Sequence, residues 1–205
     1  MAKLKAPLLS LGAAGKLGDA LVFFGWKGLD AVRTYVVPAN PNTTAQQTQR
    51  NYLKACVAAI HTSEALPVGG FDADDATSFS LLGSIYPTPR TWFNAIVKQW
   101  LDQKRASLIP IIYAAGSCTA AVLKATLKME STCESSLLTN GFIHYGTSKT
   151  SLSHTLDCTR AQLAAGREVS PLSAGVKYYF QFRPSLPVGF LGSNSGIWHA
   201  TPTAS

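Results

Sequence analysis

The chain has 205 residues, of which 46% are hydrophobic and only 14% are charged. A charged fraction this far below the usual ~25% excludes an intrinsically disordered chain and indicates that neighbouring molecules cover part of the surface. The net charge is +7, but it is evenly spread and no basic run is interleaved with aromatic residues, so no specific nucleic-acid site is expected. No apolar run approaches the ~20 residues of a membrane-spanning helix, so no membrane partner is expected either.

The first strands are predicted near the N-terminus. The apolar start of the chain is short and contains Pro7, so we expect an unprocessed, non-secreted beginning. Two apolar runs, Ala20–Phe24 and Ala31–Val37, are bounded by Gly or Pro and predict a hairpin with a turn around Trp26–Asp30. An isolated hairpin is marginal in water, and Phe23-Phe24 beside Trp26 is too apolar to be left bare. We therefore expect this hairpin to pack on helices or, preferably, on another subunit.

Three helices are predicted next. The first runs from about Thr43 to Ser63, the second from Asp74 to Ile85, and the third from Pro89 to Arg105 with Thr88 as its N-cap. With the extended arm and the hairpin, they are expected to form an N-terminal anchoring module over residues 1–107.

Strand-like periodicity replaces helical periodicity after Ser107. Seven short strands are predicted at roughly ten-residue spacing, which is typical of a β-sandwich over residues 108–205. They are Leu108–Tyr113, Ala120–Met129, Gly141–Gly146, His154–Cys158, Glu168–Val169, Val176–Arg183 and Gly196–Thr201. The predicted fold class is therefore a two-domain α+β protein, with a mainly helical module followed by an all-β, immunoglobulin-like domain.

Two segments of the predicted sandwich resemble a fibronectin type III domain. They are Tyr145-Gly-Thr-Ser148 and Leu172-Ser-Ala-Gly-Val-Lys-Tyr-Tyr-Phe180. The resemblance implies that Leu172 plugs one end of the sandwich, that Gly175 allows a tight turn, and that Tyr178 or Phe180 fills the core. The second predicted strand departs from the family because it lacks the usual Trp.

A string in the N-terminal module resembles a segment of uncharacterised proteins from tailed bacteriophages and prophages. It comprises Gly15–Asp19, Val22-Phe23 and the stretch from Arg33 to Arg50, which contains Pro38-Ala-Asn-Pro-Asn-Thr43. The resemblance implies a virion component made in the host cytoplasm. The residues that it and the bare hairpin mark as assembly-interface candidates are Phe23, Phe24, Trp26, Arg33, Tyr35, Pro38, Asn40, Pro41 and Arg50.

No arrangement of residues typical of catalysis or of metal binding is found. His61, His144, His154 and His199 have no metal-ligand spacing, and the Asp72–Asp75 segment lacks the later residues of a calcium loop. The four cysteines, Cys56, Cys118, Cys133 and Cys158, match no zinc pattern and are expected to be reduced thiols, with a bridge among the last three as the alternative. We expect no cofactor, no metal and no enzymatic activity.

These observations favour a structural component of a virion. The preferred role is capsid decoration, in which the N-terminal module docks on a major capsid or tail lattice, or on copies of itself, and the sandwich is displayed. A tail or neck protein is the first alternative. The second is a binding module whose sandwich holds host-surface glycans through exposed aromatic residues, for which Phe190 and Trp198 are the candidates.

Overall fold

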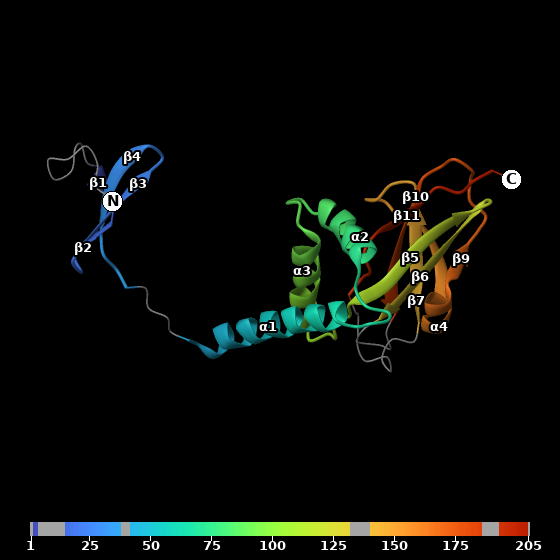
Figure 1. Cartoon of the computed structure of the whole chain (residues 1–205), viewed down its shortest axis with the longest axis horizontal. Coiled ribbons are helices and arrows are strands. Elements are labelled where there is room, and N and C mark those ends of the chain that lie inside the picture. The colour runs from blue at the N-terminus through green and yellow to red at the C-terminus, as the bar shows by residue number, and fades with distance from the viewer. Residues whose placement is uncertain (1, 4–14, 38–41, 132–139, 186–192, 205) are drawn as a thin grey trace. The chain divides into compact units, whose positions relative to one another are not determined.

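The computed structural model describes residues 2–3, 15–37, 42–131, 140–185 and 193–204 (Figure 1). The chain divides into two compact units, Met1–Thr43 and Thr44–Ser205. The described residues form four helices and three antiparallel sheets. Because three of the helices precede most of the strands, the predicted α+β class is confirmed.

The first unit is a four-stranded sheet with the order β1-β4-β3-β2. The strands are β1 (Ala2–Lys3), β2 (Gly15–Leu17), β3 (Leu21–Trp26) and β4 (Leu29–Thr34). The predicted hairpin is confirmed as β3–β4. Its two turn residues, Lys27 and Gly28, both have positive φ angles, of 50° and 75°. This is the two-residue turn whose twist matches that of paired strands.

The second unit begins with three helices, α1 (Thr44–Glu64), α2 (Ala73–Ser84) and α3 (Trp92–Arg105). Asp72 caps α2, because its carboxylate accepts hydrogen bonds from the backbone of Asp74 and Asp75 at 2.9 Å. The prediction of Thr88 as the cap of α3 is wrong, and Thr91 takes that place by accepting from the Asn94 amide at 3.3 Å.

Two sheets follow the helices. One has the order β5-β6-β9 and the other β11-β10-β7-β8. Their strands are β5 (Tyr113–Ala121), β6 (Lys124–Ser131), β7 (Asn140–Gly146), β8 (His154–Thr159), β9 (Arg167–Val169), β10 (Tyr178–Ser185) and β11 (Trp198–Ala200). Side chains from both sheets, among them Leu127, Ile143, Phe180 and Phe182, share one core.

Five of the seven predicted strands coincide with β7 to β11, the first prediction is wrong, and the second merges the end of β5 with most of β6. Residues 108–112 precede β5, and the predicted strand Ala120–Met129 contains the turn between β5 and β6. Leu123 in that turn has a φ angle of 54°, and its carbonyl accepts a hydrogen bond from the Leu172 amide at 2.8 Å. The short helix α4 (Arg160–Ala165) was not predicted, although Thr159 and Gln162 form a capping box at its start.

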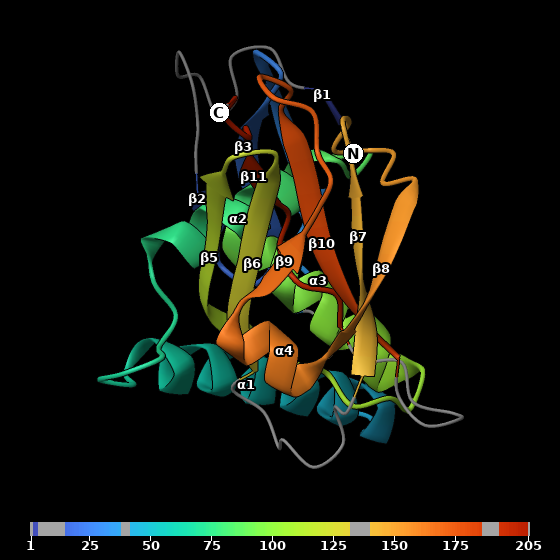
Figure 2. The same ribbon diagram turned by 90° about the vertical axis from the view of Figure 1, so that its right-hand side faces the viewer.

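The predicted domain boundary between Ser107 and Leu108 is not where the structure divides. Helices α1 to α3 lie on one side of strands β5 to β11 in Figure 1, and behind and below these strands in Figure 2. They share a second core with Ile112, Ala114 and Ile197. Strand β10 is buried on both sides, because Phe180 contacts the sandwich core and Tyr179 packs against the helical one. The helices and the sandwich therefore fold as one unit.

Candidate functional site

One face of the N-terminal sheet gathers basic and aromatic side chains. Cross-strand partners share a face, and the register pairs Lys16 with Val22 and Val22 with Arg33. The next pairs on this face are Phe24 with Ala31 and Trp26 with Leu29, which flank the turn. We call the face formed by Lys16, Val22, Phe24, Trp26, Leu29, Ala31 and Arg33, with Tyr35 beyond the end of β4, the basic-aromatic face.

Cations lie over the aromatic rings of this face. The Lys16 ammonium is 3.9 Å from the centre of the Tyr35 ring, and the Arg33 guanidinium is 5.5 Å from that of Phe24. Lys16 also forms an ion pair of 2.6 Å with Asp19. In the turn, the Lys27 ammonium is 5.9 Å from the Trp26 ring. Cation–π attraction of this kind holds the charged groups against the aromatic rings of the face, where they would otherwise extend into solvent.

The apolar residues of this unit are poorly covered. Among its described residues, the buried hydrophobic side chains are Phe23 and Ala31. Trp26 is 54% exposed and its cross-strand partner Leu29 is 47% exposed. The remaining large exposed hydrophobic side chains of the described part of the unit are Leu17, Leu21, Val36 and Val37. Trp26 and Leu29 are neighbours on one face, and Leu17 and Leu21 are neighbours on the other, so each face carries exposed apolar area.

The predicted interface candidates divide into three groups. Phe23, Phe24, Trp26, Arg33 and Tyr35 are all in this unit, with Phe23 on the opposite face of the sheet from Phe24. Arg50 is exposed on α1 in the other unit. Pro38, Asn40 and Pro41 lie outside the described residues.

The prediction missed Lys16 and Leu29 as members of the face. Lys16 lies in the Gly15–Asp19 part of the string that resembles phage proteins, but it was not among the interface candidates. Its role follows only from the pairing of β2 with β3, which places it in the row of Val22 and Arg33.

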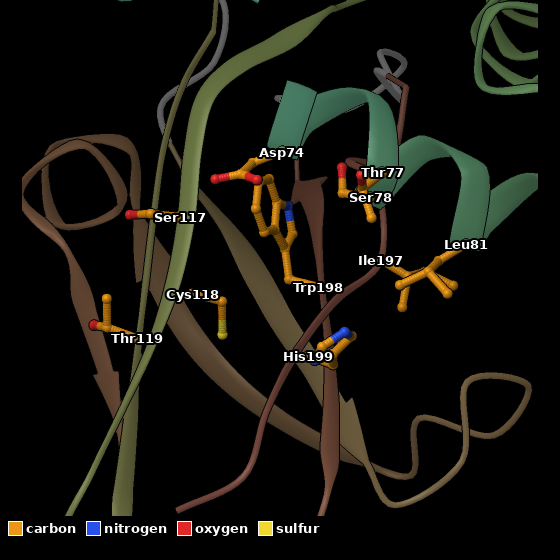
Figure 3. Close-up of a pocket in the computed structure, with 10 residues that line it drawn as sticks. All are labelled: Asp74, Thr77, Ser78, Leu81, Ser117, Cys118, Thr119, Ile197, Trp198 and His199. Carbon is orange, nitrogen blue, oxygen red and sulfur yellow. The ribbon is translucent and has the colours of Figure 1, made fainter. Parts of the chain in front are cut away.

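The second unit contains a cleft of about 310 Å³ between α2, β5 and β11 (Figure 3). Side chains of α2 line one wall of the cleft, and the indole of Trp198 points toward Asp74. Three hydrogen-bonding groups dominate the α2 side: the Asp74 carboxylate and the hydroxyls of Thr77 and Ser78. The full lining comprises Asp74, Thr77, Ser78, Leu81, Ser117, Cys118, Thr119, Ile197, Trp198 and His199.

A buried carboxylate lies next to this cleft. Asp75 is 1% exposed, and its carboxylate accepts hydrogen bonds from the Gly116 amide at 3.0 Å and from the Asp72 amide at 3.2 Å. Burial raises the pKa of Asp75 to about 6, and the backbone hydrogen bonds only partly offset that increase. Asp75 thus connects the first turn of α2 to β5 through its hydrogen bond with Gly116. Burial makes the charged form of this carboxylate unfavourable. The sequence indicated this residue only as part of the acidic Asp72–Asp75 segment, which lacks the later residues of a calcium loop.

The prediction that Trp198 is an exposed binding aromatic is wrong. Its side chain is only 9% exposed and belongs to the sandwich core. The ring lies so close to the backbone that a methyl group on Gly116 would come within 2.1 Å of it. Phe190, the other candidate for glycan binding, lies outside the described residues. His199 beside Trp198 is exposed, and partial burial followed by the charge of Lys177 lowers its pKa.

In the described part of the chain, the cysteine thiols and the potential metal ligands do not form a reactive or metal-binding cluster. Cys56, Cys118 and Cys158 are free, and burial raises their pKa values to about 12, 12 and 11. Cys133 is outside the described residues. No three or more His, Cys, Asp or Glu side chains in the described segments are grouped to hold a metal ion. Within the same segments, no helix has the length and apolar character needed to cross a bilayer.

Comparisons with known proteins identify no family. No family model matches the sequence, and no curated protein matches it. Among solved structures, one described as "Myokine structure" is 7% identical, with a TM-score of 0.38, over 46% of this chain and 99% of that chain. A likeness this weak carries no argument about fold or function.

Proposed function

We propose that this chain is a non-enzymatic structural component of a bacteriophage virion, most simply a capsid decoration protein. In this role the N-terminal sheet is the anchor, and the larger unit is displayed on the particle. Its partners are then the major capsid or tail lattice and neighbouring copies of the chain. The proposal rests on the resemblance of the string from Gly15 to Arg50 and on one structural observation.

That observation is the imbalance of burial in the N-terminal unit. Its described residues bury two hydrophobic side chains, Phe23 and Ala31, and leave six large ones exposed. Burying a large apolar side chain contributes about 1.5–3 kcal/mol. A protein that covered Trp26 and Leu29 would therefore stabilise both the complex and the sheet itself. A lattice of repeated subunits supplies such a cover at every copy.

We further propose that the strands of the second unit form a fibronectin type III domain. Three features support this assignment. Seven strands form sheets of three and four strands, and the chain crosses between the sheets as in Greek-key sandwiches. Leu172 is buried, and Gly175 has a φ angle of 72°, as the resemblance implied. The Ser173 amide donates to the Tyr178 hydroxyl at 3.3 Å, a contact that resembles the tyrosine corner of immunoglobulin-like domains.

The decisive experiment is quantitative mass spectrometry of purified particles, with the major capsid protein as the internal standard. A decoration protein is expected in a fixed ratio to the capsid protein, with many copies per particle. A ratio of only a few copies would indicate the tail or the neck instead. If washed particles contain no peptides of this chain, the virion proposal is wrong. The glycan-binding alternative is less favoured, because Trp198, its candidate among the described residues, is buried.

A further inference from the structure

The basic-aromatic face also indicates what kind of surface it binds. We infer that its partner is an acidic protein surface, in which carboxylates surround an apolar depression that receives Trp26 and Leu29. This inference rests on the proposed function for the identity of the particle, but it concerns the chemistry of the contact. It is carried by the charges of the face, the exposure of the Trp26–Leu29 pair and the positions of the cations over the rings.

The charge of the face is complementary to carboxylates. Lys16 and Arg33 lie on it, and Lys27 is in the adjoining turn. The cross-strand partner of Gly25 is Asp30, so Asp30 lies on the opposite face, and Asp19 forms an ion pair with Lys16. Arg33, over Phe24, and Lys27, over Trp26, therefore remain as net positive charges of the face and its adjoining turn. Charged groups at the rim of an interface accelerate association and select the partner.

The Trp26–Leu29 pair has the features of an interaction hot spot. The two side chains are cross-strand neighbours at the tip of the hairpin, and the two-residue turn fixes their separation. Both are about half exposed, although they are among the largest apolar groups of the unit. Tryptophan at the centre of an interface, with a polar rim, is the residue whose truncation costs the most binding.

A nucleic acid fits this face less well than a protein does. Proteins that bind single strands offer the open faces of aromatic rings to the bases. Here Lys16 covers one face of the Tyr35 ring and Arg33 covers one face of the Phe24 ring. Moreover, the exposed aliphatic side chain of Leu29 on this face matches apolar protein surface and not a phosphate backbone. A second copy of the same face is also unfavourable, because it would bring the cations of both copies together.

The test uses the full-length chain in assembled particles and a water-soluble carbodiimide, which joins a lysine amine directly to a carboxylate. Cross-links from Lys27 or Lys16 to Asp or Glu of another virion protein are expected. Particles with Trp26→Ser or Lys27→Glu should retain less of the chain, with about a 30-fold weaker association for Trp26→Ser. The matched controls are Val68→Ser, an 87% exposed valine, and Lys54→Glu, an exposed lysine of α1, which should retain it fully.

The outcomes separate this inference from the proposed function. If the unaltered chain is absent from particles, the virion proposal fails. If it is present but Trp26→Ser and Lys27→Glu incorporate as well as their controls, the inference alone is overturned. The same holds if the carbodiimide joins Lys27 only to a second copy of this chain, or if ultraviolet irradiation joins Trp26 to nucleic acid. Circular dichroism of each purified variant verifies that loss of incorporation does not come from unfolding.

Discussion

The buried carboxylate of Asp75 should make the second unit less stable as pH rises from mildly acidic to neutral. Its pKa is about 6 in the folded protein, against an ordinary value of 3.8. Between these values the folded state binds the proton more tightly than the unfolded state does. Stability from this group is therefore fully present below pH 3.8 and is lost as pH rises toward and through 6.

The expected size of the effect follows from the shift. Each pKa unit corresponds to about 1.4 kcal/mol, so the whole shift amounts to roughly 3 kcal/mol, of which about 2 kcal/mol falls between pH 4 and pH 7. The variant Asp75→Asn has no proton to lose at this position. It keeps an oxygen that can accept from the Gly116 amide, and it gives up the bond from the Asp72 amide.

The assay is chemical denaturation followed by the helical circular dichroism signal of α1 to α3, at several pH values from about 4 to 7. We expect the free energy of unfolding of the unaltered chain, relative to that of Asp75→Asn, to fall by about 2 kcal/mol over this range. Asp74→Asn is the matched control, because it removes an exposed charge from the same turn of α2. If the Asp75→Asn difference varies with pH no more than the Asp74→Asn difference does, burial does not disfavour the Asp75 charge and the reasoning is refuted.

Three further substitutions test the fold by the same denaturation assay. Thr91→Ala should destabilise by about 1 kcal/mol because it removes the cap of α3, whereas Thr88→Ala should change stability by less than about 0.5 kcal/mol; equal effects would contradict the position of the cap. Tyr178→Phe should cost about 1 kcal/mol through loss of the corner hydrogen bond, and Tyr179→Phe, its neighbour on the other side of β10, should cost clearly less. Gly116→Ala should cost at least about 2 kcal/mol, since the new methyl would overlap an indole ring, and a neutral result would show that the two do not pack closely.

Local sequence patterns predicted most of the elements correctly because each depends on neighbouring residues. Helices α1 to α3 follow from apolar spacing and from breaks at Gly and Pro, and the β3–β4 hairpin follows from two apolar runs with a Gly in the turn between them. The errors also have local causes. Thr88 and Thr91 are both acceptable caps, and the hydrogen bond from the Arg90 amide to the Gly83 carbonyl, at 3.2 Å, ties that segment to the end of α2. Helix α3 therefore starts at Trp92, with Thr91 as its cap.

The candidate site could be predicted only in part, because it depends on strand register. Phe24 and Trp26 were recognisable as an apolar pair. The approach of Lys16 to Tyr35 joins residues on β2 and beyond β4, which no short pattern connects. The burial of Trp198 was unpredictable for the same reason. The tryptophan lies within the last predicted strand, Gly196–Thr201, but Gly116, far earlier in the chain, leaves the space into which its ring packs.

The contrast between the two units gives the basic-aromatic face its significance. The second unit buries both sides of β10. One of its cores lies between the two sheets, and the other lies between the helices and the strands. It can therefore be stable without covering by a partner. The first unit has a fixed hairpin tip, a well-defined register and an ordered set of cations, but few buried side chains in its described part. A sheet this well specified and this poorly covered is what an anchor requires, since a partner that buries Trp26 and Leu29 stabilises the sheet and the attachment together.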